Sequence, residues 1–177
     1  PADRPGLVAA GKMRYQPGRV SRDGEVLLEP GSGDVDAARE VIDQFVLHYD
    51  ACGLSSTCFK VLHDIRCLSV HFLLDIDGTI YQTMDLRDQG WHATKSNYRS
   101  IGIEIANIGS YAPGSEGHKN LAEWYEQDAN GTRIRIPKWK KDPGVRTRGF
   151  VGRPARNELI TGVMQGETQD QYDFTPE

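Results

Sequence analysis

Short apolar stretches in the middle of the chain alternate with polar residues, in the period of two that is typical of β-strands. The clearest stretches are residues 45–49 (FVLHY), 70–75 (VHFLLD) and 100–108 (SIGIEIANI). Each carries one residue able to do chemistry: His48, His71 and Glu104. A polar group in such a strand costs about 1–3 kcal/mol when it lacks a partner, and a charge costs more. We therefore expect these three side chains to face a cleft.

Between these strands the pattern predicts one helix and one hairpin. Ser55 or Ser56 can cap a helix that runs to about Cys67. The residues that form its apolar side, at helical spacing, are Phe59, Leu62 and Ile65. The Asp77-Gly78 pair is a strong signal for a two-residue turn, so residues 70–75 and 79–84 should pair as a hairpin.

The chain before the first strand has a different character. Residues 1–33 mix proline, glycine and charge, which predicts an N-terminal arm. Residues 34–44 are predicted to be a short polar segment that leads into the first strand. The rest of the chain, residues 34–177, is interpreted as one domain.

After the Glu104 strand the pattern becomes irregular. Residues 109–172 carry scattered glycine, proline and charge, with a short helical candidate at 121–127 and an alternating piece at 133–136. So much irregular chain is unusual in a compact domain, and we expect a long insertion. Residues 173–177 read as the start of a helix with Thr175 as its N-cap, so the chain looks cut at that point.

Composition and charge exclude several classes of protein. The chain has 177 residues, enough for one domain, with 38% hydrophobic and 26% charged residues. A net charge of −4 argues against binding to nucleic acid or to anionic membranes. The longest apolar runs are far shorter than the roughly 20 residues that a membrane span needs. The three cysteines are Cys52, Cys58 and Cys67, and their spacing allows either a local disulfide or reduced thiols.

The polar strand residues suit metal-assisted hydrolysis. An imidazole at a strand end, such as His48, is oriented well for zinc, although a lone histidine can equally be a hydrogen-bonded core residue. Glu104 between two isoleucines is either paired with an arginine or used as a base. A metal-bound water beside a glutamate is a hydrolytic arrangement. His71 in its strand and Trp91-His92 on a loop are weaker candidates for contacts in the same cleft.

Four blocks in order, HYD, SVHFLLDIDGTIYQ, WHA and SIGIEIAN, resemble the N-acetylmuramoyl-L-alanine amidase family of zinc hydrolases, over about residues 44–109. The resemblance implies an α/β fold with a central mixed β-sheet flanked by helices. It also implies a groove for the peptide stem of peptidoglycan, and a Zn²⁺-activated water that cuts the amide between N-acetylmuramic acid and L-alanine. Such a protein would act on the cell wall in the periplasm or outside the cell.

Individual positions carry roles over from this resemblance. His48 matches the first zinc ligand, and Glu104 matches the glutamate used as catalytic base. Relatives that use a tyrosine place it where this chain has Val70. His71, Trp91 and His92 are expected to line the substrate groove. The Cys52 and Cys58 spacing resembles a disulfide loop of the peptidoglycan-recognition proteins, which favours an oxidised pair and an exported protein.

The chain departs from the family pattern at the remaining metal ligands. The family supplies them in a motif like G-H-…-K-x-D-P-G, and residues 140–144 (KKDPG) copy only its last part. The only histidine near enough in sequence to consider is His118, which lies too far before Asp142 for the compact loop. We interpret 140–144 as a coincidental turn and expect the ligands in a missing C-terminal segment or a separate chain. The alternative uses His118 and Asp142.

Two rival interpretations remain at this point. With His48 as sole ligand, the isolated chain should bind zinc weakly and be inactive, since catalytic zinc sites use three protein ligands. The chain could instead be a non-catalytic module that binds peptidoglycan or muropeptides. A third interpretation, a purely structural domain, requires Glu104 to be held in a salt bridge.

Overall fold

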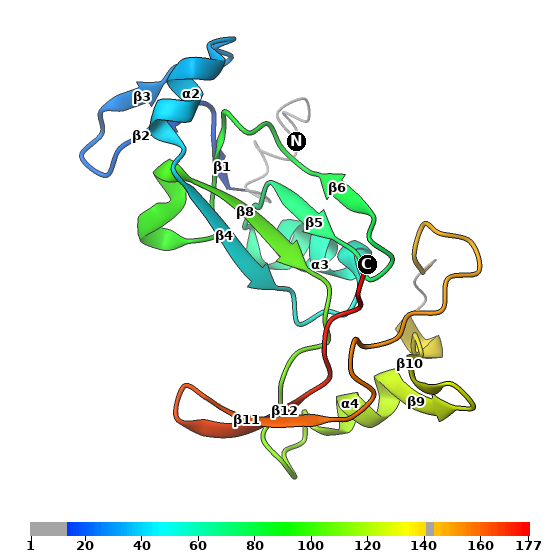
Figure 1. The fold of residues 1–177 in the computed structure, drawn as a ribbon. Helices are drawn as coiled ribbons and strands as arrows, with labels where there is room; N and C mark the ends of the chain where they lie inside the picture. Colours follow the sequence, from blue (N-terminus) through cyan, green and yellow to red (C-terminus); the bar gives the residue numbers. More distant parts are fainter. Residues whose placement is uncertain (1–13, 141–143) are drawn as a thin grey trace. The chain divides into compact units, whose positions relative to one another are not determined.

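A mixed four-stranded sheet forms the centre of the α/β fold in the computed structural model, which describes residues 14–140 and 144–177 (Figure 1). The strands lie in the order β4 (Gln44–Tyr49), β8 (Ser100–Ile105), β5 (Phe72–Leu74) and β6 (Ile80–Gln82). Backbone bonds from Asp43 to Arg99 and from Asp50 to Ile105 make β4 and β8 parallel. The expected mixed α/β fold is therefore confirmed, with His48 in β4 and Glu104 in β8, whereas the strand expected at 70–75 is shortened to β5 and His71 lies just before it.

The hairpin expected at Asp77-Gly78 is also present. The N–H of Asp75 donates to the carbonyl of Thr79 (2.9 Å), and that of Thr83 donates to the carbonyl of His71 (2.9 Å), so β6 runs antiparallel to β5. Gly78 has a φ of 77°, the left-handed conformation that glycine adopts without strain. The turn chemistry read from the sequence thus sets the register of this sheet edge.

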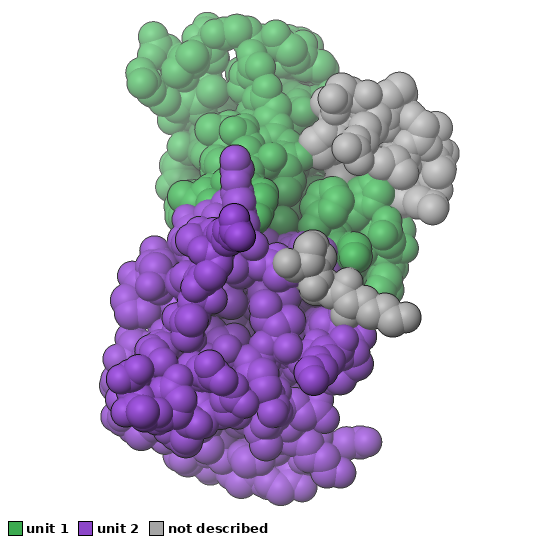
Figure 2. All heavy atoms as spheres, turned by 90° about the vertical axis from the view of Figure 1, so that its right-hand side faces the viewer, with its two compact units in different colours: residues 1–48, 59–73, 80–104 green, residues 49–58, 74–79, 105–177 purple. Residues whose placement is uncertain are grey.

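The chain divides into two compact units, coloured separately in Figure 2. Unit 1 consists of the described residues of 1–48, 59–73 and 80–104, and unit 2 of those of 49–58, 74–79 and 105–177. Residues 1–13 of the expected N-terminal arm lie outside the described residues. The smaller elements of unit 1 are β1 (Tyr15–Gln16), β2 (Arg19–Val20), β3 (Val26–Leu28), α2 (Val35–Val41), β7 (Gln89–Gly90) and the 3-10 helix η2 (Thr94–Arg99).

Helix α2 replaces the polar segment that was expected at residues 34–44, so that expectation was wrong. Asp34 caps this helix, because its side chain accepts hydrogen bonds from the N–H groups of Asp36 (3.0 Å) and Ala37 (2.9 Å). Ala38 is the one residue of the helix that is buried. With so short an apolar side, the sequence gives almost no helical periodicity to detect.

The helix predicted from Ser55 exists but changes type half-way. It consists of α3 (Ser55–Lys60) followed by the π-helix η1 (Val61–Arg66). Phe59 and Leu62 line a small apolar cavity, as their expected place on the buried side requires. Ile65 is 73% exposed, which corrects its assignment to that side. A π-turn holds more residues than an α-turn, so side chains beyond Lys60 no longer follow the spacing of an α-helix.

Unit 2 has its own core and is more regular than the predicted insertion. Trp124 is 2% exposed and packs among Leu54, Ile76, Leu121 and other apolar residues. Its ring covers Gly53, where an added Cβ would lie 2.6 Å from the indole. The elements of unit 2 after the sheet are α4 (Lys119–Trp124), β9 (Tyr125–Asp128), β10 (Gly131–Ile134), the 3-10 helix η3 (Lys138–Lys140), β11 (Ile160–Met164) and β12 (Glu167–Gln171).

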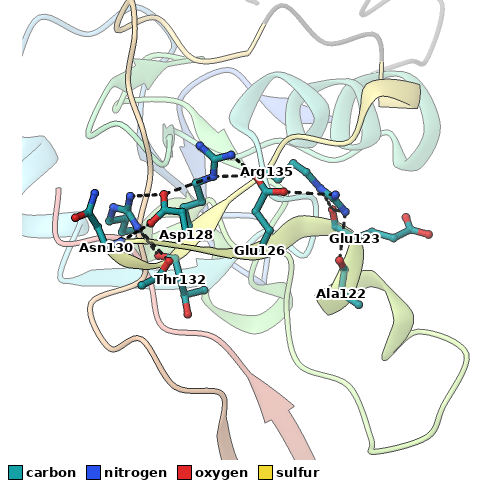
Figure 3. Close-up of polar contacts among 10 residues, drawn as sticks. Ala122, Glu123, Glu126, Asp128, Asn130, Thr132 and Arg135 are labelled. Atoms are coloured by element: carbon teal, nitrogen blue, oxygen red, sulfur yellow. Dashed lines mark hydrogen bonds and ion pairs between the residues drawn. The ribbon is translucent and has the colours of Figure 1, made fainter.

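The helix and strand expected near 121–127 and 133–136 correspond to α4 and β10, with shifted bounds. The β9–β10 hairpin carries a network of charged contacts (Figure 3). Arg135 donates to the carbonyls of Ala122 (3.3 Å) and Glu123 (3.0 Å), while Arg153 pairs with Asp128 at 2.7 Å. These groups are exposed or half-buried, so each pair adds little stability and the network chiefly sets orientation.

The β11–β12 hairpin was not expected. Its turn residues, Gln165 and Gly166, both have positive φ (51° and 86°), as a primed hairpin turn requires. At the end of the chain, Thr175 donates its hydroxyl to the carbonyl of Ile76 (2.7 Å) instead of capping a helical turn within the described residues.

The described residues contain no disulfide, so the expected bond between Cys52 and Cys58 is absent from the structure. Cys58 lies on the buried side of α3 and is 2% exposed. The N–H of Cys52 is held by the carboxylate of Asp50 (2.9 Å) in the turn before the helix. The two cysteines therefore lie in different surroundings. Cys58 packs in the core, and Cys52 lies in the turn before the helix.

Replacing Trp124 by alanine should lower the free energy of unfolding by about 3–5 kcal/mol, because a large buried ring leaves a cavity against Gly53. Trp139→Ala is the matched control, since that ring is 62% exposed, and its effect should stay below about 1 kcal/mol. Urea unfolding of both variants measures the difference. Equal losses would contradict the assignment of Trp124 to the core.

Candidate active site

His48 belongs to the covered face of the central sheet. Along β4, residues alternate between half-buried and exposed, and His48 has the same parity as the half-buried Gln44 and Val46. The exposed positions are Phe45, Leu47 and Tyr49, at 57%, 64% and 42%. The strand therefore directs the imidazole into unit 1, and burial lowers the pKa of His48.

His92 lies directly against His48. The Nδ1 atom of His92 is 3.1 Å from the Nε2 atom of His48, and the two rings are perpendicular. The loop that carries His92 is fixed by Asn97, whose side-chain oxygen accepts the N–H groups of His92 (3.1 Å) and Ala93 (2.7 Å). On its other side, the Nε2 atom of His92 is 3.3 Å from the hydroxyl of Ser100.

Gly102 in β8 makes room for this histidine. A Cβ at Gly102 would lie 2.5 Å from the ring of His92, so no larger residue fits without moving the ring. His92 therefore packs against the face of β8 to which Ser100 and Gly102 point. Glu104, two residues further along the strand, points to the same side and is half-buried. His48 and Glu104 thus share one face of the sheet, on neighbouring strands.

His71 is completely buried, and both its ring nitrogens are engaged. Its Nδ1 atom accepts the backbone N–H of Gly102 (3.1 Å), and its Nε2–H donates to the carbonyl of Asp88 (3.0 Å). Since a backbone N–H only donates and a carbonyl only accepts, these two contacts favour a neutral ring with its proton on Nε2, and Nη2 of Arg19, at 3.4 Å from the same nitrogen, then lies beside it as a neighbouring charge and not as a hydrogen-bond donor. His71 therefore braces the sheet in this structure, and its contact with a substrate stays a prediction.

Arg19, which sequence reasoning missed, is the buried cation of the site. It is 0% exposed and donates to the carbonyls of Leu86 (2.7 Å), Tyr98 (3.1 Å) and Ser100 (3.1 Å). Burial lowers its pKa to about 10, so it remains charged at neutral pH. It sits in β2 within a segment read as an arm, and no local pattern in the sequence distinguishes it from an exposed arginine.

The histidines are held in the neutral state. Burial, followed by the neighbouring histidines and Arg19, lowers the pKa of His92 to about 3. Burial and Arg19 also lower the pKa of His71 to about 4. Neutral imidazole is the form that binds metal ions, so the electrostatics of the site favour ligation by the histidine that remains accessible.

The donor set matches zinc chemistry in kind, as a neutral imidazole and a carboxylate on one face. In the part of the chain that the structure describes, however, no group of three or more His, Cys, Asp or Glu residues is close enough to hold a metal ion. Of the alternative ligands, His118 is paired with Asp170 (2.8 Å) in unit 2, and Asp142 lies outside the described residues. Trp91 is half-buried, and its backbone N–H donates to the hydroxyl of Ser69 (2.9 Å).

The family model of N-acetylmuramoyl-L-alanine amidases matches residues 38–144. The chain belongs to the N-acetylmuramoyl-L-alanine amidase family. The match contains His48, His71, Trp91, His92 and Glu104, and it extends to the end of the KKDPG segment at 140–144. Membership of the family expected from the four sequence blocks is thereby confirmed.

The chain is similar to the N-acetylmuramyl-L-alanine amidase AmiD from E. coli, solved in complex with the substrate anhydro-N-acetylmuramic acid-L-Ala-D-γ-Glu-L-Lys. The two are 22% identical with a TM-score of 0.34, over 66% of this chain and 44% of AmiD. The chain thus spans less than half the length of that amidase. No curated protein matches the chain.

In this amidase-family chain, Arg19→Met should lower the free energy of unfolding by about 3 kcal/mol or more, because four carbonyl groups lose their donor. Arg22→Met removes the same charge from an exposed position two residues after β2 ends and should change stability by less than about 0.5 kcal/mol. Urea unfolding compares the pair. Similar, small losses would show that the buried guanidinium does not hold the site together.

The buried His71 should make stability depend on pH. Its pKa is about 4 in the folded chain against 6.5 unfolded, so the unfolded state takes up the proton first. The stability that neutral His71 contributes is complete above pH 6.5 and is lost as pH falls toward 4. His71→Asn keeps an acceptor for the Gly102 N–H and does not titrate. The advantage of wild type over this variant should shrink by about 2 kcal/mol between pH 7.5 and pH 5, as measured by urea unfolding. A constant difference would contradict the burial of a neutral ring.

Proposed function

We propose that this chain is part of a zinc-dependent hydrolase that cuts the amide bond between N-acetylmuramic acid and L-alanine in peptidoglycan. The observation that carries the proposal is the placement of His48 and Glu104 on one face of the sheet, on adjacent strands within the family match. The family match supports a substrate of this class.

In this proposal His48 is one of the residues that hold Zn²⁺. When bound, the ion polarises the scissile carbonyl and makes a water molecule more acidic. Catalytic zinc sites have three protein ligands, so the proposal requires two more from outside the described cluster of His48, His71 and His92. On the prediction that these two ligands belong to another segment or a separate chain, the 177-residue chain by itself should bind zinc weakly and show no turnover.

Glu104 is the proposed general base. Its carboxylate takes a proton from the attacking water as the water oxygen bonds to the amide carbon. It then returns that proton to the nitrogen of L-alanine as the C–N bond breaks. The products are the free lactyl carboxylate of the muramic acid and a peptide with a free amino group. Val70, where tyrosine-using relatives carry their tyrosine, is buried and apolar, so it offers no second acid–base group.

The substrate would contact the loop that follows β7. Trp91 and His92 are half-buried there, and an indole face suits the apolar side of a sugar ring or peptide stem. His71 contributes beneath this loop, through the contacts that fix Gly102 and Asp88. Because peptidoglycan lies beyond the cytoplasmic membrane, we place the site of action in the periplasm or outside the cell. Among the described helices, none is long and apolar enough to cross a membrane.

One observation favours a second candidate function, a module that binds muropeptides without cutting them. The described residues do not bring three metal-binding side chains together, as a complete zinc site requires. In that case the Trp91 loop would still recognise the substrate, and Glu104 would be dispensable.

Glu104→Gln separates these functions when made in the complete natural protein. It should reduce kcat for muropeptide hydrolysis by at least about 100-fold, because the proton acceptor is lost, with muropeptide affinity within about twofold of wild type. Glu40→Gln, at an exposed position of α2, is the control and should leave both unchanged. Product release measured by chromatography gives kcat, and calorimetry gives affinity. Full turnover by the Glu104 variant would reject its role as base, and binding without hydrolysis by wild type would establish the binding module.

A further inference from the structure

The three clustered histidines have six ring nitrogen atoms, and five of them are engaged. Both nitrogens of His71 and both of His92 have partners, as does Nε2 of His48. Among the described residues, Nδ1 of His48 is the one ring nitrogen of this cluster without a partner. A ligand that enters the cluster without breaking a contact therefore has a single nitrogen to bind.

The contact between His48 and His92 is well suited to orient a metal ligand. A histidine that binds a metal through one nitrogen usually donates its other N–H to an acceptor, which fixes both the position of its proton and the angle of the ring. Here Nδ1 of His92, at 3.1 Å, faces Nε2 of His48. For His92 to accept, its own proton must be on Nε2, next to the hydroxyl of Ser100 at 3.3 Å.

We propose that His92 is a positioning residue: its Nδ1 accepts the Nε2–H of His48 and leaves Nδ1 of His48 as the nitrogen that binds the metal. This inference rests on the proposed function, in which His48 is a zinc ligand, and adds which nitrogen binds and what holds it. The sequence suggested instead that His92 contacts the substrate. The contact with His48 gives it a role on the metal side of the site.

His92 is itself held from three directions, as a positioning residue should be. Asn97 fixes its backbone, Ser100 lies at the far side of its ring, and the ring rests on the space left by Gly102. A methyl group at Gly102 would displace the ring without altering either histidine. Gly102 therefore offers a second way to break the contact.

The first test is nitrogen-15 NMR of the histidine rings in the 177-residue chain at pH 7.5. We expect the His48 proton on Nε2 and an unprotonated Nδ1. Zn²⁺ added as the metal alone should shift the Nδ1 resonance of His48 while its Nε2 proton remains. Loss of the Nε2 proton on adding zinc would overturn the inference, because the metal would then have replaced His92 as the partner of that nitrogen.

The second test compares three variants by the same zinc titration. His92→Asn keeps an acceptor near the position of Nδ1 and should bind zinc within about threefold of wild type. His92→Leu has similar size without an acceptor and should bind at least tenfold more weakly, the range found for lost outer contacts of metal ligands. Gly102→Ala should resemble His92→Leu, whereas Gly162→Ala, where an added methyl meets nothing, should resemble wild type.

The outcomes distinguish this inference from the proposed function. Equal zinc affinity in the leucine, asparagine and wild-type chains would overturn the positioning role while leaving His48 as a ligand. Zinc that binds the chain and perturbs no resonance of His48 would overturn the proposed metal role, and the inference with it. A variant that does not fold is recognised by its collapsed NMR dispersion, and the Gly102→Ala and His92→Asn chains then still decide the question.

Discussion

The buried guanidinium of Arg19 is the contact on which the organisation of unit 1 depends. Taking a cation out of water costs several kcal/mol, and this cost is offset only when its hydrogen-bonding groups find partners. The two Nη atoms of Arg19 find them in backbone carbonyls at Leu86, Tyr98 and Ser100, from two separate segments of the chain, while its buried Nε has no partner among the described residues. Asp88, close by, holds the N–H of Gly18 (3.0 Å) and so anchors the strand that carries the arginine. One side chain thereby ties the N-terminal strand to the loop before β8.

The same cation governs the protonation of the histidines next to it. Its charge adds to the effect of burial in keeping His71 and His92 neutral. A neutral ring both donates and accepts, whereas a protonated ring only donates. The contacts of His71 with Gly102 and Asp88 need one donor and one acceptor, and so does the proposed role of His92 between His48 and Ser100. The buried arginine thus protects an arrangement that protonation would break.

The sequence predicted what depends on local pattern and missed what depends on distant partners. Alternation along β4 and β8 placed His48 and Glu104 on strands, and the shared face follows from their parity once the strands are neighbours. Asp77-Gly78 gave the hairpin because that dipeptide selects its turn. Arg19 was not recognised, because burial of an arginine is decided by carbonyls nearly 70 residues or more away. The π-turn after Lys60 likewise has no signature in the spacing of apolar residues, which is why Ile65 was misplaced.

The polar residues of the central sheet differ in whether their hydrogen-bonding atoms have partners. An imidazole or carboxylate in an apolar strand costs free energy unless it has a partner. In the histidine cluster most ring nitrogens avoid that cost because they have partners. Backbone groups contact both ring nitrogens of His71, and His48 and Ser100 contact those of His92. The ring nitrogen of the cluster that has no hydrogen-bond partner among the described residues is Nδ1 of His48. It lies on the face of the sheet to which Glu104 also points. A site that satisfies every other nitrogen of the cluster and leaves this one open can receive a ligand at that atom without breaking a contact, and in the proposed function that ligand is a zinc ion.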